Sequence, residues 1–297
     1  MVAACEPCPQ PIRHLELVSD HPINDPAALS MRHAPGKPVL KGVNWGGLRT
    51  LYIKEVRRFF KVQMQTVWAP AITTLLYLAI FTVALGRGGH LVMGVPFANF
   101  IAPGLIVMAM LQNAFANASF SLLVGKIQGN IVDYLMPPLS TGELIAGLVG
   151  AAVTRAFLVG FAVWLVMLLW PGVSVDVRRP ELVLWFGLMG ALLLSFLGLL
   201  TSVWADKFDH AAAVTNFVVT PLSLLSGTFY SVNQLAPAFR AVSHANPFFY
   251  VISGFRAGFL GVSDSPLLVG GAGLLMLNIV LWAACYALLK SGWKIKN

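Results

Sequence analysis

Residues 182–204, LVLWFGLMGALLLSFLGLLTSVW, decide the fold, because this stretch contains no charged side chain. A bilayer core of about 30 Å is crossed by about 20 residues of α-helix, in which every backbone group is hydrogen-bonded. The stretch is too long for a barrel strand and does not alternate between polar and apolar residues. Five further stretches have the same character: residues 67–85, 97–124, 144–170, 211–230 and 266–289. The sequence therefore predicts an all-α integral membrane protein with six transmembrane helices.

The composition of the whole chain supports this prediction. Only 11% of the 297 residues are charged, whereas soluble domains carry about 25%, and the mean hydropathy is +0.76. A water-soluble globular protein is thereby excluded. The net charge of +8 does not indicate a nucleic-acid partner, because the basic residues are separated by long apolar runs and form no single patch. The expected surroundings are the lipid bilayer.

The N-terminal region differs from the rest. Residues 1–44 are rich in proline and poor in aromatic side chains, so they bury too little apolar surface to offset their ordering entropy. They are predicted to form a disordered cytoplasmic tail, and residues 45–297 to form the transmembrane domain. Cys5 and Cys8 form a C-x-x-C pair with two histidines downstream. Their spacing departs from that of zinc fingers, which favours reduced thiols, but a metal site stays open as the alternative.

Basic residues at both ends of the apolar region predict its orientation. Because positive side chains gather on the cytoplasmic side of a bilayer, both termini are expected there, and six crossings agree with this. The residues on which this rests are Arg49, Lys54, Arg57, Arg58 and Lys61 before the first span and Lys290, Lys294 and Lys296 after the last.

Residues 45–61, directly before the first span, have a helical periodicity. At 100° per residue the apolar side chains fall on one arc and the basic side chains on the opposite arc. This pattern predicts an amphipathic helix that lies on the inner leaflet. It serves either as a membrane anchor or as a partner-docking element, and both interpretations stay open. Its candidate functional residues are Lys54, Glu55, Arg57, Arg58 and Phe59.

Residues 231–265, between the fifth and sixth predicted spans, are too apolar for a solvated loop and too polar to cross the bilayer. Pro237, Pro247 and Arg256 interrupt the apolar side chains. We expect a broken helical hairpin that dips into the outer leaflet. A seventh span is the alternative, but it would place the lysine-rich C-terminus outside, against the charge rule.

Motifs for catalysis or ion coupling are missing from the sequence. There is no G-x-x-x-x-G-K-[ST] phosphate loop, no H-E-x-x-H zinc motif and no G-x-S-x-G nucleophile motif. The acidic residues lie at the ends of the predicted spans and not at mid-membrane, where proton-coupled carriers place theirs. Transport would therefore need an external source of energy. Arg155, near the middle of the third span, has two open interpretations, structural pairing or a place on the substrate path.

Short motifs follow one another along the chain in a recognisable order. They are KEVRRF at 54–59, Gln65-Thr66 with Pro70, PGL at 103–105, PLS at 138–140 with Glu143, SGTFY at 226–230, Asn246-Pro247 with Tyr250, and SGFR at 253–256. In their order and spacing the chain resembles the type-2 ABC exporter permeases, a six-span class that exports drugs, lipo-oligosaccharides and polysaccharides. The resemblance covers about residues 45–295. The long proline-rich tail departs from the pattern, so its role stays open.

The resemblance implies a multi-pass protein of the bacterial inner membrane that works as a homodimer. It implies outward transport of an amphiphilic, lipid-linked or drug-like substrate, with ATP and Mg²⁺ held by a separate ABC ATP-binding subunit. This chain is accordingly expected to bind no cofactor and no metal and to have no catalytic residues. The inner loop, residues 126–141, resembles the coupling helix of the class, and its apolar residues recur at helical spacing until two prolines stop the helix. The candidate coupling residues are Ile127, Ile131, Asp133, Tyr134 and Leu135, and the candidate pathway or gate residues are Arg155, Phe239, Asn246, Pro247, Tyr250 and Arg256.

Two other functions remain as alternatives. An ion-coupled secondary transporter or a channel would work without an ATP-hydrolysing partner. An intramembrane lipid-modifying enzyme would need catalytic groups, and the candidates form no recognisable constellation. These candidates are Arg155, His210, His244, Arg256 and Asp264.

Overall fold

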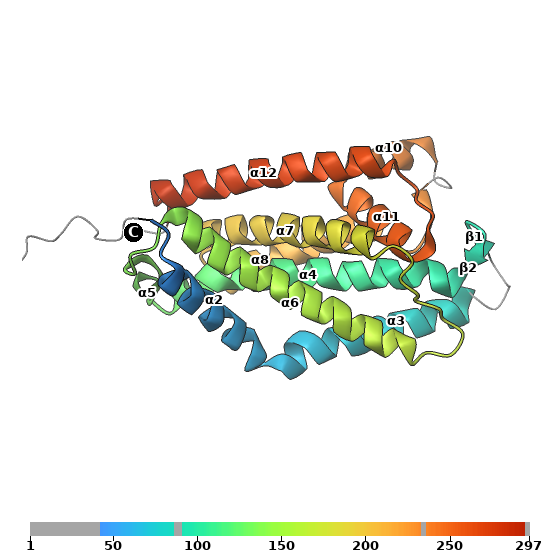
Figure 1. The fold of residues 1–297 in the computed structure, drawn as a ribbon, viewed down its shortest axis with the longest axis horizontal. Coiled ribbons are helices and arrows are strands. Elements are labelled where there is room, and N and C mark those ends of the chain that lie inside the picture. Colours follow the sequence, from blue (N-terminus) through green and yellow to red (C-terminus); the bar gives the residue numbers. More distant parts are fainter. Residues whose placement is uncertain (1–41, 86–90, 233–235, 295–297) are drawn as a thin grey trace, which may run out of the picture. The chain divides into compact units, whose positions relative to one another are not determined.

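The computed structural model describes residues 42–85, 91–232 and 236–294. The predicted disordered tail, with Cys5 and Cys8, lies outside these residues except for its last three positions. The described residues belong to one compact unit. Its long helices run side by side, with α5 at one end of the bundle and two short strands at the other (Figure 1). We call these the α5 end and the strand end.

Five helices of the described part are long and apolar enough to cross a membrane. One consists of a π-helical turn, η2 (Met64–Trp68), that continues into α3 (Ala69–Leu85). The other four are α4 (Phe97–Ile127), α6 (Thr141–Leu168), α7 (Pro180–Trp204) and α12 (Leu267–Ser291). In the most apolar part of α4, 89% of the residues are buried, against 22% for the η2–α3 helix and for α12. The second predicted span is therefore the centre of the bundle.

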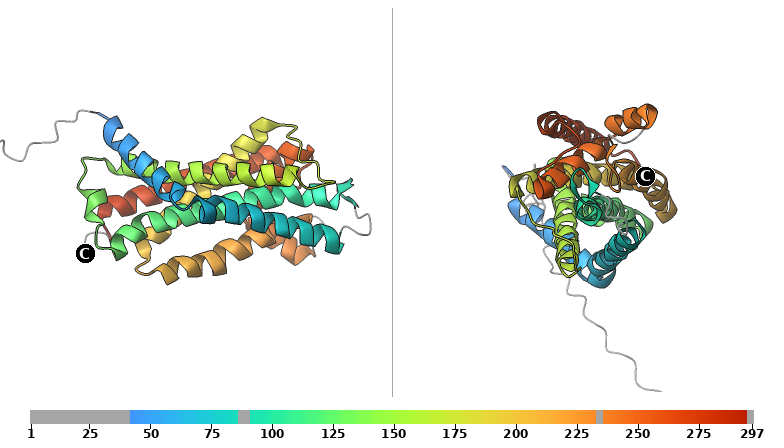
Figure 2. Two further views of the ribbon diagram at one scale, coloured as in Figure 1. Left: turned by 90° about the horizontal axis from the view of Figure 1, so that it is seen from below. Right: turned by 90° about the vertical axis from the view of Figure 1, so that its right-hand side faces the viewer.

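The fifth predicted span differs from the expectation. In place of one helix over 211–230, the structure has α8 (Phe208–Val214), a π-helical turn η4 (Thr215–Val219) and α9 (Thr220–Leu225). These three pieces form a continuous but irregular helix along the bundle (Figure 2). It is not among the five helices of the described part that are long and apolar enough to qualify as spans.

Both π-helical turns precede a proline. Pro70 lies two residues beyond η2, and Pro221 lies two residues beyond η4. A proline has no N–H to donate and clashes with the carbonyl four residues earlier, so the helix widens locally. The wider turns bend the helices at these two places.

The hairpin between the fifth and sixth predicted spans has the expected broken form. It consists of α10 (Pro237–Ala245) and α11 (Pro247–Leu260) at the strand end (Figure 1). With 9 and 14 residues, neither helix reaches the length of about 20 needed for a crossing, so the alternative of a seventh span is wrong. α11 is buried and packs against α4, α7 and α12. Gly261 ends it with a left-handed φ of 78°.

The remaining elements are short. α2 (Trp45–Phe60) occupies the place of the predicted amphipathic helix and leads into η2. α5 (Val132–Leu135) lies in the inner loop. At the opposite end, β1 (Leu91–Val92) and β2 (Val95–Pro96) form an antiparallel hairpin with Leu91 opposite Pro96 and Val92 opposite Val95. The two residues of its turn both have positive φ, as a type I′ turn requires.

Candidate coupling and transport site

The inner loop is less regular than its apolar pattern predicts. A helical stripe from Ile127 to Leu135 requires one continuous helix, but α4 ends at Ile127 and Gly129, with a φ of 73°, turns the chain before α5 begins. The prediction of a continuous coupling helix is therefore wrong. Four apolar side chains of this region are nevertheless at least 40% exposed: Ile127, Val132, Leu135 and Met136. Asp133 is also exposed, and Ile131 is half-buried.

Tyr134 is the coupling candidate that points inward. Its side chain is buried, and a Cβ added at Gly125 of α4 would lie 3.2 Å from its ring. Lys54 of α2 places its Nζ 3.8 Å from the centre of the ring, and the hydroxyl donates a hydrogen bond to Glu55 Oε1 at 3.1 Å. Burial, followed by the charge of Glu55, raises the pKa of the Tyr134 phenol, which therefore keeps its proton at neutral pH.

Glu55 joins three elements at one carboxylate. It is fully buried although its neighbours Lys54 and Arg57 are exposed. Besides the bond from Tyr134 of α5, its Oε2 accepts a hydrogen bond from Ser121 Oγ of α4 at 2.7 Å and pairs with Arg58 Nη2 at 2.9 Å. The sequence placed Glu55 on α2, and its pairing with Arg58 follows from their spacing of three residues. The burial of Glu55 could not be predicted from local sequence, because the residues that cover it belong to α4 and α5.

A second connection holds the start of α2 to the same loop. The backbone N–H of Asn44 donates to Glu143 Oε1 at 2.6 Å, and that of Ser140 donates to Glu143 Oε2 at 2.7 Å. Ser140 and Glu143 thereby form a capping box at the start of α6. Asn44 Nδ2 also donates to the carbonyl of Pro138 at 3.2 Å. α2 is therefore attached to the inner loop at its first turn and again near its middle.

Polar contacts continue from α2 into the bundle. Arg58 Nη2 donates to the carbonyl and to Oδ1 of Asn117, at 3.0 and 3.3 Å. Arg155 of α6 donates to Asn117 Oδ1 at 3.4 Å and to Asn113 Oδ1 at 2.9 Å. Among the described residues, Arg155 thus pairs with amide oxygens of α4 and with no carboxylate. Phe59, the last candidate residue of α2, is buried and stacks on Phe60.

Two cavities are lined in part by residues of these contacts. A half-open cavity of about 630 Å³ is bounded by α3, α4 and α9. It combines polar with aromatic side chains, among them Gln65, Thr73, Tyr77, Gln112, Asn113 and Phe229. A groove of about 700 Å³ follows α2 and is lined by Thr50, Ile53, Lys54, Glu55, Arg57, Arg58 and Lys61. We call these the bundle cavity and the basic groove.

The predicted gate residues at the strand end do not line the bundle cavity. Asn246 is buried and caps α11 by accepting the N–H of Phe248 at 3.1 Å. Its Nδ2 donates to the carbonyl of Leu222 and to Ser226 Oγ. Pro247, the first residue of α11, supplies the fixed φ that a helix start accepts. These contacts hold the break of the hairpin against the end of α9.

Arg256 is buried at the centre of the strand end. It pairs with Asp264 at 3.2 Å, donates to the carbonyl of Gly227 at 2.7 Å, and lies 3.8 Å above the ring of Phe100. The other two gate candidates are elsewhere. Tyr250 packs against α12 beside a cavity of about 270 Å³, and the side chain of Phe239 is 59% exposed.

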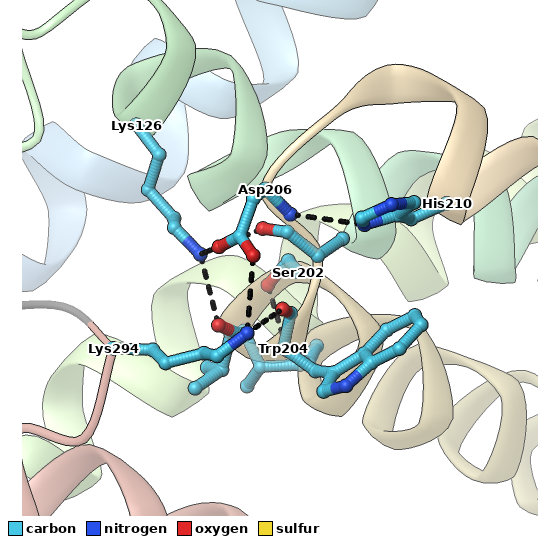
Figure 3. Close-up of polar contacts among 9 residues, drawn as sticks. Lys126, Ser202, Trp204, Asp206, His210 and Lys294 are labelled. Carbon is cyan, nitrogen blue, oxygen red and sulfur yellow. Dashed lines mark hydrogen bonds and ion pairs between the residues drawn. The ribbon is translucent and has the colours of Figure 1, made fainter.

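Sequence reasoning missed a charged cluster at the α5 end (Figure 3). Asp206, after α7, pairs with Lys126 of α4 at 3.5 Å and with Lys294, beyond α12, at 3.0 Å. Lys126 also donates to the carbonyls of Val203 and Ala205, at 2.9 and 2.6 Å. The hydrogen bond from Lys294 and the two positive charges lower the pKa of the Asp206 carboxyl. The cluster ties the ends of three long helices together.

Comparisons with known proteins give these features a context. The family described as ABC-2 type transporter matches residues 47–260. The inner membrane transport permease YadH of Escherichia coli (strain K12) is 38% identical over 253 residues, which are 85% of this chain and 98% of YadH. Nodulation protein J of Neorhizobium galegae is 27% identical over 209 residues, which are 68% of this chain and 77% of that protein. Nodulation protein J of Rhizobium meliloti (strain 1021) is 25% identical over 216 residues.

These matches settle the class of protein. Together with the five apolar helices, they make the chain a multi-pass protein of the inner membrane. The family implies an ATP-binding partner subunit and a transport function, which excludes the lipid-modifying enzyme. The chain belongs to the ABC-2 type transporter family and is the membrane permease subunit of an ABC transporter.

Proposed function

We propose that two copies of this permease form an exporter that is driven by a separate ATP-binding subunit docked at the α5 end. ATP and Mg²⁺ bind to that subunit, and this chain binds no cofactor. Both termini lie on the cytoplasmic side, as the basic residues around α2 and after α12 favour. The substrate is an amphiphilic, lipid-linked or drug-like molecule that moves outward.

The observation that carries this proposal is the double attachment of α2 to the inner loop. Glu55 joins α2 to Tyr134 of α5, and Glu143 joins the start of α2 to the start of α6. The exposed side chains of Ile127, Leu135 and Met136 offer an apolar surface beside these connections. A partner that pushes on this surface moves α2 together with the loop, because neither can shift without breaking buried hydrogen bonds.

Motion of α2 reaches the bundle cavity through the chain itself. α2 leads through η2 into α3, which forms one wall of that cavity. A π-helical turn interrupts the regular α-helical hydrogen bonding, and such turns are common at functional sites. Closure of two ATP-binding subunits would tilt α2, and η2 would pass the tilt to α3. The cavity then changes its opening between the two leaflets, as alternating access requires.

The half-open bundle cavity supports a homodimer. Of its polar side chains, Gln65 and Thr73 are exposed, and Gln112 of the central helix α4 is half-buried. Polar groups that face hydrocarbon without a partner are unfavourable, so this side of the protomer needs a cover. A second copy related by a two-fold axis presents the same helices and closes one shared path between α3, α4 and the α8–α9 helix of both subunits.

The wall of the bundle cavity favours an amphiphilic substrate. Tyr77, Phe81 and Phe229 supply aromatic surface, and Gln112 and Asn113 supply hydrogen-bonding groups. Such a mixed wall suits a molecule with an apolar part and a polar head better than a free ion. At the strand end, the hairpin of α10 and α11 closes this path, and its anchored residues Asn246 and Arg256 set the position of the gate.

The test replaces the exposed apolar side chains of the inner loop. Leu135→Asp and Met136→Asp are expected to abolish substrate-stimulated ATP hydrolysis and to weaken capture of the ATP-binding subunit at least about tenfold, since a charge cannot enter an apolar docking groove. Both side chains are at least 40% exposed, so the permease should unfold at its usual temperature. The measurement is ATP hydrolysis and transport by the reconstituted complex.

Leu91→Asp is the matched control, because Leu91 is 66% exposed but lies at the strand end. It should leave capture and coupling unchanged. The proposal fails if the α5 variants keep coupled activity, or if the permease alone moves substrate under an ion gradient with no ATP-binding subunit present.

A further inference from the structure

Two arginines from different helices meet at one amide of α4. Arg58 of α2 and Arg155 of α6 both donate to Asn117 Oδ1, at 3.3 and 3.4 Å. Arg155 also donates to Asn113 Oδ1 at 2.9 Å. Two guanidinium groups so close together repel each other, and because the side chain of Arg58 is 28% exposed and that of Arg155 is half-buried, water screens the repulsion only in part.

The carboxylates within reach do not balance this pair. In the described ranges, Glu55 is the only acidic residue within ion-pair distance of either arginine, and it contacts Arg58 alone. Two guanidinium groups against one carboxylate leave one positive charge in excess. Arg58 Nη1 and Arg155 Nε are, moreover, buried without a hydrogen-bond partner in the part of the chain that the structure describes. Buried donors of this kind are rare, and each calls for a missing acceptor.

The pair lies where the basic groove and the bundle cavity approach each other. Arg58 lines the groove, and Asn113, which holds Arg155, lines the cavity. Lys61 of the groove and Gln65 of the cavity are four residues apart in the chain, on either side of the short turn between α2 and η2. Lys54 and Arg57 add positive charge along the groove. An anionic group that moves along α2 therefore meets the two arginines before it reaches the cavity.

We propose that Arg58 and Arg155 bind the oxyanion of an amphiphile's headgroup, a phosphate, sulfate or carboxylate, as the substrate passes from the basic groove into the bundle cavity. The oxygens of the headgroup accept hydrogen bonds from Arg58 Nη1 and Arg155 Nε, and its charge offsets the excess positive charge. The apolar part of the substrate stays against the aromatic side of the cavity. This inference rests on the proposed function, in that it makes the bundle cavity the transport path and names the substrate class as anionic.

The test measures binding to the complex of permease and ATP-binding subunit in a neutral maltoside detergent without nucleotide. The probe is radiolabelled hexadecyl phosphate, detected by scintillation proximity. The wild-type complex should bind it saturably, and hexadecyl sulfate should compete. Hexadecanol and hexadecyltrimethylammonium, which have the same chain without the anion, should compete at least about tenfold more weakly. Equal competition by these two, or by inorganic phosphate, would overturn the proposal.

Single substitutions test whether Arg58 and Arg155 bind the headgroup, or whether the overall positive charge of α2 attracts it. Arg155→Gln and Arg58→Gln should each weaken binding of hexadecyl phosphate at least about tenfold. Arg155→Lys keeps the positive charge but loses the planar set of guanidinium donors, so it should weaken binding less. Arg49→Gln removes the same charge from an exposed position of α2 outside the groove and should bind as the wild type does. Unchanged binding by both Gln variants would contradict the assignment. Neither arginine lies on the docking surface, so the Leu135→Asp permease, measured without the ATP-binding subunit, should still bind hexadecyl phosphate as the wild-type permease alone does. The two proposals therefore fail separately.

Discussion

At the scale of single residues, Glu55 has the strongest expected effect on stability. Glu55→Gln keeps the shape of the side chain but leaves Arg58 without its carboxylate and forces an amide to face both Ser121 and Tyr134. Removing one member of a buried charged network leaves its partners buried without compensation, which destabilises a protein more than the loss of a surface ion pair does. We therefore expect a loss of about 2–4 kcal/mol in the free energy of unfolding. Thermal unfolding of the purified permease in detergent measures this loss.

Asp133→Asn is the matched control for Glu55→Gln. Asp133 lies next to Tyr134, but its side chain is exposed. Its replacement should change the free energy of unfolding by less than about 0.5 kcal/mol. If the two variants unfold at the same temperature, the carboxylate of Glu55 does not hold α2 to α5.

The same residues mark the limit of sequence reasoning at this scale. Periodicity placed Lys54, Arg57 and Arg58 on the arc of α2 opposite its apolar side chains. Lys54 and Arg57 are indeed exposed, but Arg58 turns toward Asn117 of α4. Tyr134 belongs to the predicted apolar stripe, yet its ring lies under Lys54. Local patterns give the face of a helix, but the partners that bury a polar group come from elements distant in the sequence.

At the scale of elements, the close approach of α7 and α11 gives a second prediction. A methyl group added at Gly254 of α11 would meet the buried ring of Phe186 of α7. Gly254→Ala therefore has to displace a packed aromatic ring, and we expect a loss of about 1–3 kcal/mol in the free energy of unfolding. Because α11 carries Arg256, the variant should also lower transport. Thermal unfolding and reconstituted transport measure the two effects.

Gly273→Ala is the matched control within α12. A methyl group there has nothing within 4 Å, so the variant should unfold at the wild-type temperature or slightly above it. Equal destabilisation by both alanines would mean that the loss comes from removing glycine from a helix and not from contact with Phe186.

Element boundaries followed from the sequence where local chemistry sets them. The long span predicted from 144 begins at Thr141 in α6, where Ser140 and Glu143 cap the helix, and the break predicted at Pro247 is the start of α11. The fifth predicted span differs in its bounds and regularity, because hydropathy does not register how Pro221 widens the preceding turn or that the helix ends at Leu225. The prediction of a continuous helix over residues 127–135 was wrong because the spacing of apolar residues does not reveal the turn at Gly129. Long apolar helices were thus predictable, and irregular backbone was not.

At the scale of the whole molecule, the Asp206 cluster predicts a dependence on pH. Its lowered pKa means that the ionised carboxylate stabilises the fold fully above the ordinary aspartate pKa of about 3.9 and that this contribution is lost as the pH falls through the folded-state value. Asp206→Asn should therefore unfold at a lower temperature than the wild type at pH 7, with the difference vanishing in strong acid. Because Asp206 is exposed, high salt should shrink the difference as well. A difference that is independent of both pH and salt would contradict this prediction.

Cysteine cross-linking tests the proposed homodimer at the same scale. Thr73 lies on the exposed side of α3 in the bundle cavity, whereas Met276 is 70% exposed on α12. In a background with the natural cysteines replaced, Thr73→Cys should give a cross-linked dimer in membranes with a short bis-maleimide, because a two-fold axis brings equal positions together. Met276→Cys should stay monomeric. A dimer formed only through Met276→Cys would place the axis at α12, and the bundle cavity would then face lipid with its polar wall uncovered.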